Sequence, residues 1–112
     1  MTSIYITTQF HGFHHWPDAP EEVAFLRSLH RHLFKVRVDI EVGHPDRQVE
    51  FFILKGFVDH VIQKWLLAQL KATPAMSCEM MAECLAKRLL AQYPSLLKVE
   101  VSEDGTNYPN PR

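Results

Sequence analysis

Apolar and polar residues alternate along residues 33–42, and this alternation constrains the fold more than any other feature of the chain. The segment reads LFKVRVDIEV and places five apolar side chains on one face: Phe34, Val36, Val38, Ile40 and Val42. Successive side chains of a strand point to opposite faces, so the pattern predicts a β-strand with one buried face. The opposite face is mostly charged, with Arg31, Lys35, Arg37, Asp39 and Glu41.

The flanking segments predict further strands. Residues 3–10 (SIYITTQF) and 96–104 (LLKVEVSED) are rich in β-branched and apolar residues, which is typical of strands. Residues 43–47 (GHPDR) suit a turn, and residues 48–52 (QVEFF) predict a short returning strand. Residues 16–28 predict a short helix or an ordered loop, with Asp18 as the cap and Pro20 in the first turn.

From about Ile53 the apolar period becomes helical, and a first helix is expected to end near Pro74. Its apolar stripe consists of Leu54, Phe57, Val58, Val61, Trp65 and Ala68. Ser77 is expected to cap a second helix, which has Glu79 in its first turn. This order of elements predicts an α+β fold, one domain over residues 1–112, with an antiparallel sheet and two helices on one face. Pairing with a second copy is one way to cover the edges of such a sheet.

Composition narrows the class of protein. The formal net charge is −1 and there is no basic run, which argues against nucleic acid or an anionic membrane as a partner. No apolar run approaches the length of a membrane span, and residues 1–10 lack the features of a signal peptide, so a cytoplasmic protein is expected. Cys78 and Cys84 form no CxxC motif and are expected to be buried small hydrophobes in a reducing compartment.

Histidine is unusually frequent, with seven in the chain. Five of them precede residue 33: His11, His14, His15, His30 and His32. His30 and His32 are two positions apart, so they share the apolar face of the strand and can approach one cation. A third ligand from the end of the first strand would complete a three-histidine zinc site with one open position, which is typical of catalytic zinc. The alternative is that His30 and His32 form hydrogen bonds at the rim of the sheet.

Five short motifs follow one another along the chain: Phe10–His14 (FHGFH), Leu29–His32 (LHRH), Glu50–Lys55 (EFFILK), Ser77–Glu79 (SCE) and Val101–Glu103 (VSE). In type and order this set resembles the 6-pyruvoyl-tetrahydropterin synthase and 6-carboxy-tetrahydropterin synthase family. The family pattern runs F-x-A-x-H, L-H-G-H, D-F-x-x-L-K and P-T-x-E, and ends in a glutamate on the last strand. The resemblance covers nearly the whole chain.

The resemblance implies a zinc site and a pterin site. His14, His30 and His32 would be the zinc ligands, with His11 and His15 as neighbours. Glu103 would anchor the pterin ring by accepting two parallel N–H bonds. The alternative for Glu103 is a solvated side chain in a terminal turn.

The implied fold is the tunnelling fold (T-fold), whose sheets join across subunits into a barrel, with trimers stacked into hexamers. The implied activity is that of a zinc-dependent lyase acting on a dihydropterin such as 7,8-dihydroneopterin triphosphate. The implied pathway is tetrahydrobiopterin or queuosine biosynthesis, the latter through 7-deazapurines.

The proton-transfer groups of the family are missing at their expected positions. Leu26 stands where the family has its cysteine, and Arg27 and Ser28 replace the glutamate that some members use instead. The aspartate–histidine pair would fall near residues 66–67, which are both leucine. The pair at residues 59–60 comes too early, and an exposed helical pair is the favoured interpretation there.

Two further departures concern the motifs themselves. Arg31 replaces the glycine of H-G-H and is expected to point outward, although it could also crowd the site or offer a cation to a phosphate. Asp104 replaces the threonine that often follows the terminal glutamate.

The candidate proton carriers are therefore weak: His15, Glu22 and His60. The leading hypothesis is a zinc-dependent lyase with altered chemistry. The alternative is a non-catalytic module that binds zinc and a pterin or purine, and a third hypothesis is an oligomer held together by structural zinc.

Overall fold

A computed structural model describes residues 1–69 and 76–103. Its elements, in chain order, are β1 (Thr2–His14), the 3₁₀ helix η1 (Glu21–Arg27), β2 (His30–Val42), α1 (Phe51–Gln69), α2 (Cys78–Leu90) and β3 (Leu96–Glu103). The predicted α+β class is confirmed. The expected end of the first helix at Pro74 lies outside the described residues.

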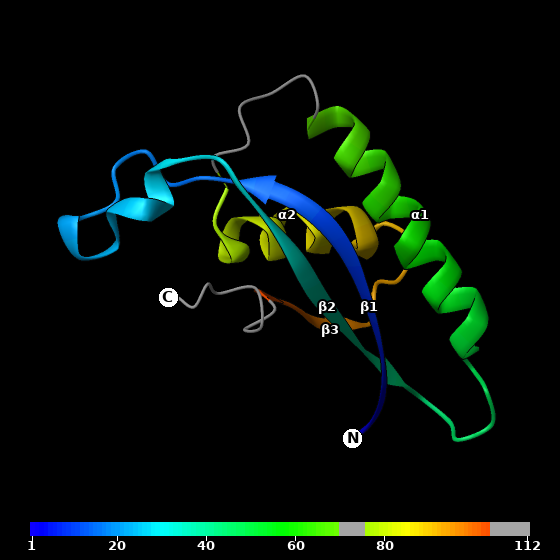
Figure 1. Ribbon diagram of the computed structural model, residues 1–112. Coiled ribbons are helices and arrows are strands. Elements are labelled where there is room, and N and C mark those ends of the chain that lie inside the picture. Colours follow the sequence, from blue (N-terminus) through cyan, green and yellow to red (C-terminus); the bar gives the residue numbers. More distant parts are fainter. Residues whose placement is uncertain (70–75, 104–112) are drawn as a thin grey trace.

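The three strands form one antiparallel sheet with β2 in the centre (Figure 1). β1 pairs with β2 along its whole length, from Thr2 opposite Val42 to His14 opposite His30. β3 pairs with the other edge of β2, with Glu103 opposite Phe34. The apolar face of β2 is buried as predicted, since Phe34, Val38 and Ile40 have no exposed surface. The sequence pattern therefore fixes which face of the sheet meets the helices.

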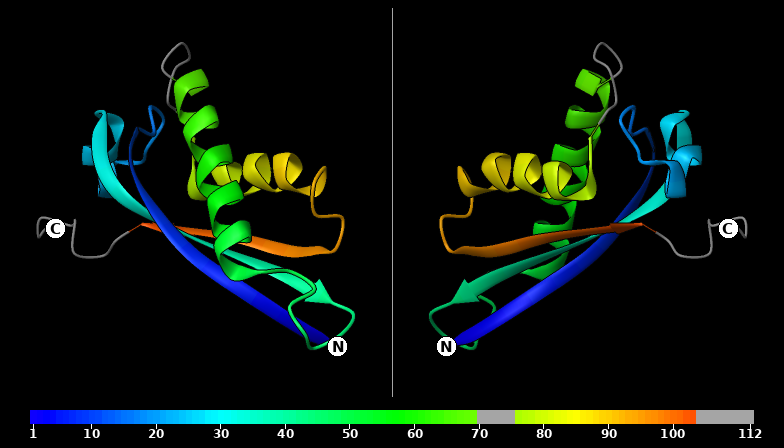
Figure 2. Two further views of the ribbon diagram at one scale, coloured as in Figure 1. Left: turned by 90° about the vertical axis from the view of Figure 1, so that its right-hand side faces the viewer. Right: turned by 90° about the vertical axis from the view of Figure 1, so that its left-hand side faces the viewer.

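Both helices pack on the same face of this sheet (Figure 2). α1 contacts β1, and α2 contacts β3. The core between the layers contains Ile6, Phe10, Phe34, Val36, Val38, Ile40, Leu54, Val58, Val61, Ile62, Trp65, Met81, Leu85 and Leu89. No helix within the described ranges has both the length and the apolar character needed to cross a membrane.

The prediction of a returning strand at residues 48–52 is wrong, because α1 begins at Phe51. The Glu50 carboxylate accepts a hydrogen bond from the Ile53 backbone N–H at 3.0 Å, and the Glu50 carbonyl accepts one from Leu54 N–H at 2.9 Å. The Glu50 carboxylate therefore satisfies one of the first-turn N–H groups that have no partner inside the helix, and the Glu50 carbonyl accepts the first helical hydrogen bond. The aromatic run after it belongs to this first turn, and its side chains are exposed.

The start of α2 is as predicted. The Ser77 hydroxyl accepts a hydrogen bond from Met80 N–H at 3.1 Å, so Ser77 is the N-cap. The cap of η1 differs from the expectation, because Pro20 occupies that position and contributes no side-chain hydrogen bond. η1 lies in a lobe that projects beyond the sheet from the end where β1 finishes and β2 starts (Figure 1).

Candidate metal centre

Three side chains from three strands converge at one end of the sheet. His14 is the last residue of β1, His32 lies near the start of β2, and Glu103 is the last residue of β3. Each can offer one ligand atom, and these atoms all lie within 4.8 Å of one another. We call His14, His32 and Glu103 the metal cluster.

Strand pairing brings these residues together. Glu103 is paired with Phe34, and His32 is two positions from Phe34 on the same face of β2. On the other edge of β2, Gly12 of β1 pairs with His32. His14 is two positions after Gly12 and therefore lies on the same face of β1. All three cluster residues thus project from the helix-covered face at the end where the sheet meets the η1 lobe.

The Glu103 carboxylate lies between the two imidazoles. Its Oε1 is 2.8 Å from His14 Nε2, and its Oε2 is 3.7 Å from His32 Nε2. The exposed fractions of the three side chains are 10% for His14, 7% for His32 and 19% for Glu103. Burying a charged carboxylate costs free energy unless a positive charge or hydrogen-bond donors lie next to it. The two imidazoles can provide both when they are protonated.

The other nitrogen of His14 fixes the orientation of its ring. Nδ1 lies 2.9 Å from the Met76 carbonyl oxygen, so an Nδ1–H donates to that carbonyl. With the proton on Nδ1, the Nε2 lone pair of a neutral His14 points toward the cluster. A histidine that ligates a metal is commonly oriented by such a hydrogen bond to its second nitrogen.

The surroundings of His14 shift its protonation. Burial lowers its pKa, but the hydrogen bond to Glu103, the Met76 carbonyl and the charge of Glu103 raise it, and the net pKa is raised above its usual 6.5. Without a cation the protonated ring can thus donate from both nitrogens. A bound cation would replace the proton between Nε2 and Glu103.

Aromatic packing holds the rings in place. Phe34 lies beneath both imidazoles, with ring centroids 5.1 Å from His14 and 5.9 Å from His32 in edge-to-face contacts. A Cβ on Gly12 would come within 3.2 Å of the rings of Phe10 and Phe34. Glycine at this position therefore lets the aromatic side chains pack directly below the cluster.

A cavity of about 590 Å³ borders the metal cluster. Glu103 contributes to both, so a molecule in this cavity would lie next to a cation held by the cluster. The walls come from the loop after β1, the first turn of α2 and the end of β3. This volume lies within the range of small-molecule sites.

The structure brings together two of the three predicted zinc ligands, His14 and His32. The backbone of His30 pairs with that of His14, which places it at the same end of the sheet. The side chain of His30 lies outside the described part of the structure, and so does Asp104. Glu103 points inward as its strand position predicted, but its carboxylate contacts the histidines, a contact that the ring-anchor interpretation did not include.

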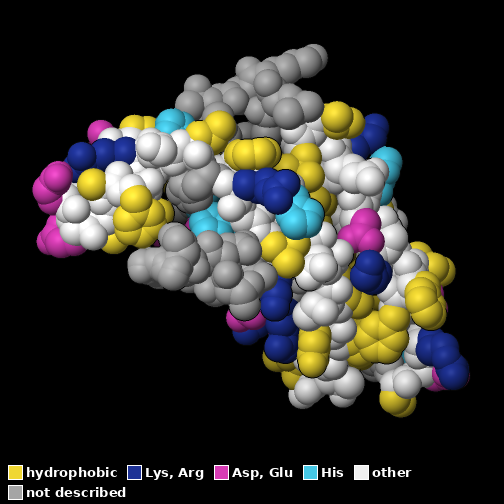
Figure 3. Space-filling model, in the orientation of Figure 1, with side chains coloured by type: hydrophobic (Ala, Val, Ile, Leu, Met, Phe, Trp, Pro, Cys, Tyr) yellow, Lys and Arg dark blue, Asp and Glu magenta, His cyan; other side chains and the backbone are white. Residues whose placement is uncertain are grey.

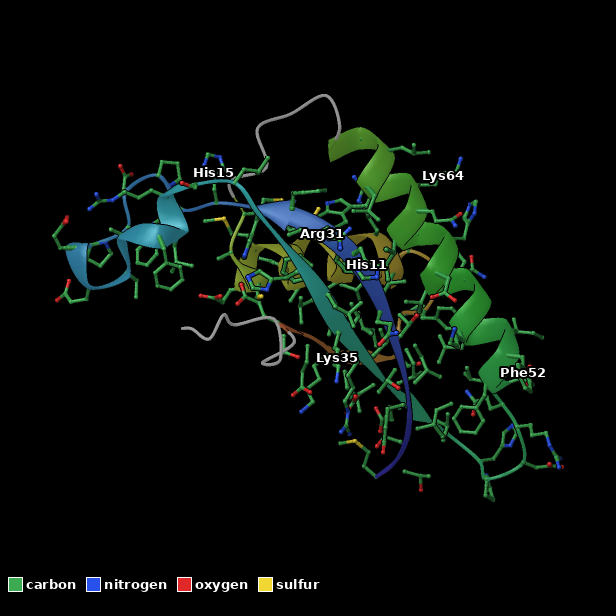
Figure 4. All side chains as sticks on the ribbon, in the orientation of Figure 1. His11, His15, Arg31, Lys35, Phe52 and Lys64 are labelled. Atoms are coloured by element: carbon green, nitrogen blue, oxygen red, sulfur yellow. The ribbon has the colours of Figure 1, made fainter. Side chains whose placement is uncertain are left out.

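The weak candidates for proton transfer are dispersed. His15 lies on the cavity wall, and its Nδ1 is 3.4 Å from the Arg27 carbonyl oxygen. Glu22 is exposed on η1, and His60 is exposed on α1. Neither of these two lines the cavity. Figure 4 shows His15 at the base of the η1 lobe.

The pair at residues 59–60 is a surface feature of α1. Asp59 accepts a hydrogen bond from the Thr8 hydroxyl at 2.6 Å and pairs with Lys55 at 2.9 Å. These contacts tie α1 to β1, and Asp59 is not among the residues of the metal cluster. The exposed helical interpretation fits this placement better than a proton relay.

Sequence reasoning missed two components of the site. The Met76 carbonyl is a backbone group, and no sequence signal identifies it. Cys78 was expected to be an inert small hydrophobe, yet it lines the cavity beside Glu103. Burial, together with the charges of Glu103 and Glu79, raises the pKa of the Cys78 thiol to about 11, so the thiol stays protonated at neutral pH. Its position at the start of a capped helix was the only available signal.

Comparison with protein-family models gives no match for this sequence, and a search among curated proteins gives none either.

Proposed function

We propose that this chain is a zinc-binding protein similar to the 6-pyruvoyl-tetrahydropterin synthase and 6-carboxy-tetrahydropterin synthase family, and that it acts as a lyase on a dihydropterin. The observation that carries the proposal is the convergence of His14, His32 and Glu103 at the border of a cavity. Two imidazoles and a carboxylate from separate strands form a donor set that binds zinc in many catalytic sites.

The residues of the cluster fit a zinc ion in chemistry and in setting. His14 and His32 would supply nitrogen, Glu103 would supply oxygen, and the Met76 carbonyl would keep His14 in the ligating tautomer. His30, beside this group in the strand register, is the proposed further ligand. A bound zinc would supply Lewis-acid polarisation of a hydroxyl or carbonyl on the substrate side chain.

The chain's own residues would then bind and orient the substrate. The cavity would hold the pterin ring, and Glu103 would divide its two oxygens between the metal cluster and any donor that enters the cavity. His15 is the one titratable group among the three proton-carrier candidates that faces this cavity, and it is the proposed carrier. Leu26 cannot transfer a proton.

The proposed assembly is the tunnelling fold with trimers or hexamers, in a cytoplasmic protein. Within the described ranges, no strand pairs with the outer edge of β1 or of β3. Both edges are therefore available for pairing between subunits, and such pairing would join the three-stranded sheets into a barrel.

The second candidate is a non-catalytic module that binds zinc and a pterin or purine. Leu26, and the leucines at residues 66–67, stand where the family has proton-transfer groups. General acid–base groups commonly contribute 10²–10⁴-fold to a rate, so their loss would favour binding without turnover.

Metal content tests the proposal. Purified wild-type chain should contain about one zinc per chain, and His14→Ala and His32→Ala should each retain less than roughly one tenth of it, because each removes a ligand of a three-donor site. Glu103→Ala should also lower zinc content, and His30→Ala shows whether His30 completes the set. The measurement is elemental analysis of zinc after gel filtration.

His11→Ala is the matched control for these variants. His11 is on the same strand as His14 but points to the opposite, exposed face, so its replacement should leave zinc content unchanged. A wild-type chain that purifies without zinc, and takes none up on titration, would contradict the proposal.

Turnover separates the two candidate functions. The zinc-loaded chain would be incubated with 7,8-dihydroneopterin triphosphate while acetaldehyde and new pterins are monitored. Product formation that is lost in His14→Ala supports the lyase. Saturable pterin binding without any product supports the non-catalytic module.

A further inference from the structure

The cavity beside the metal cluster has an aromatic wall. Trp16 lines it from the loop between β1 and η1, and Cys78 lines it from the first turn of α2. Glu103 forms part of the boundary with the metal cluster. A ligand in the cavity would therefore have an indole on one side and the start of a helix on another.

Trp16 is exposed although its backbone is well fixed. Its N–H donates to the Leu26 carbonyl at 2.7 Å, and its own carbonyl accepts from Ala19 N–H at 3.1 Å. The Arg27 side chain donates to the Ala19 carbonyl at 2.8 Å and so ties the same loop to η1. Even so, Trp16 is 49% exposed.

This combination distinguishes Trp16 from the other tryptophan of the chain. Trp65 is only 2% exposed and packs against Phe10 in the core. An indole left half in water gives up much of the favourable burial that its large apolar surface could provide. A rigid loop that holds it there presents a flat surface at little entropic cost, because the side chain has only two rotatable bonds.

We propose that Trp16 is the stacking surface for a planar heteroaromatic ring bound in this cavity, with the ring held next to the metal cluster. The class of ligand rests on the proposed function, while the role of Trp16 rests on the loop geometry and the cavity. Two further residues with polar side chains, Cys78 and Ser102, also line the cavity. Trp16 thereby determines specificity for flat ligands over aliphatic ones.

Binding measurements on variants test this role. The probe is 7,8-dihydroneopterin, titrated calorimetrically into zinc-loaded full-length chain. Trp16→Ala should weaken binding about 2- to 10-fold, which is the range expected from the loss of one aromatic stacking contact, and Trp16→Phe should weaken it less. Phe25→Ala is the matched control, because Phe25 is an aromatic residue of the same lobe, 54% exposed, that does not line the cavity. Its replacement should leave the affinity unchanged.

A measurement on the wild-type chain avoids any dependence on how the variants fold. Acrylamide should quench Trp16 and leave the buried Trp65 nearly untouched. Saturating 7,8-dihydroneopterin should lower the acrylamide quenching constant, because the ring would cover the indole. It should also slow alkylation of Cys78 by iodoacetamide, with Cys84, which does not line the cavity, as the internal reference in mass spectrometry.

The outcomes separate this inference from the proposed function. If the zinc-loaded chain binds the pterin equally well after Trp16→Ala, or if the ligand leaves the quenching constant unchanged, the role of Trp16 is overturned while the zinc proposal stands. If the wild-type chain takes up no zinc on titration but binds the pterin in a Trp16-dependent manner, the role of Trp16 stands and the zinc proposal fails. If Trp16→Ala changes the oligomeric state and leaves the affinity intact, the indole serves an interface and the inference is overturned.

Discussion

At the scale of single residues, His14 connects the metal cluster to the rest of the molecule. One of its ring nitrogens contacts Glu103 and the other contacts the Met76 carbonyl, so the ring is held between two acceptors. Both contacts favour the protonated imidazole, and together they outweigh the effect of burial on its pKa. In the absence of metal this arrangement makes stability depend on pH.

The sign of that dependence follows from the raised pKa of His14. The contribution of a group whose pKa is raised in the folded state is complete below the unfolded value, and is lost as the pH rises through the folded value. We therefore expect the free energy of unfolding of the chelator-treated protein to fall as the pH increases from the ordinary histidine pKa of 6.5 through the raised pKa of folded His14. Urea denaturation at several pH values would measure this decrease.

Glu103→Gln should reduce the pH dependence, because it removes the charge that favours the protonated ring. Glu100→Gln is the control, since Glu100 is on the same strand, is exposed and pairs with Lys98. An identical pH profile for wild type and Glu103→Gln would contradict the conclusion that Glu103 raises the pKa of His14.

Strand periodicity predicts the face of a strand on which a side chain lies, and it predicts no other feature of this site. Alternation placed His32 and Glu103 on the inner face of their strands, whereas His14 was named through the family resemblance, and the structure has all three on that face. Alternation could not give the distance across strands, so the contact between Glu103 and His14 was missed. The Met76 carbonyl was beyond prediction, because its role depends on where the chain enters α2.

At the scale of elements, the start of α1 shows how local propensity misleads. Val49, Phe51 and Phe52 all favour strands, and this composition predicted a strand. Glu50 instead completes a helical first turn, and the residues after it continue with helical spacing into the buried positions Leu54 and Val58. Burial of the later stripe outweighed the preference of the first few residues.

The cap of α2 should be measurable. Ser77→Ala removes the hydroxyl that accepts from Met80 N–H and should cost about 1 kcal/mol in free energy of unfolding. Ser3→Ala, at an exposed position of β1, is the control and should be nearly neutral. Urea denaturation of both variants gives the comparison, and equal stabilities would show that the cap contributes nothing.

At the scale of the whole molecule, the sheet has two open edges and the surface has exposed apolar side chains. β1 is thirteen residues long and forms one edge, and the eight-residue β3 forms the other. Phe52, at the start of α1, is 85% exposed and points away from the sheet (Figure 4). Hydrophobic side chains also gather on the η1 lobe and near the start of α1 in the space-filling view (Figure 3). Long edges and exposed apolar surface are both typical of proteins that assemble.

We expect sedimentation equilibrium to give a trimer or hexamer of the 13.0 kDa chain. Pairing of strand edges does not depend on a metal, so chelation should leave the mass unchanged. Dissociation on chelation would instead support the hypothesis of an oligomer held by structural zinc. A monomer under all conditions would contradict the proposed barrel.

The metal cluster also has a consequence for the order of events during synthesis. Its residues come from the first, central and last strands, and the Met76 carbonyl that orients His14 precedes α2. An ion bound at the cluster would therefore reach full affinity only after β3 has emerged from the ribosome and paired with β2. Metal loading would then follow folding, because a nascent chain that ends before β3 has the two imidazoles but lacks Glu103.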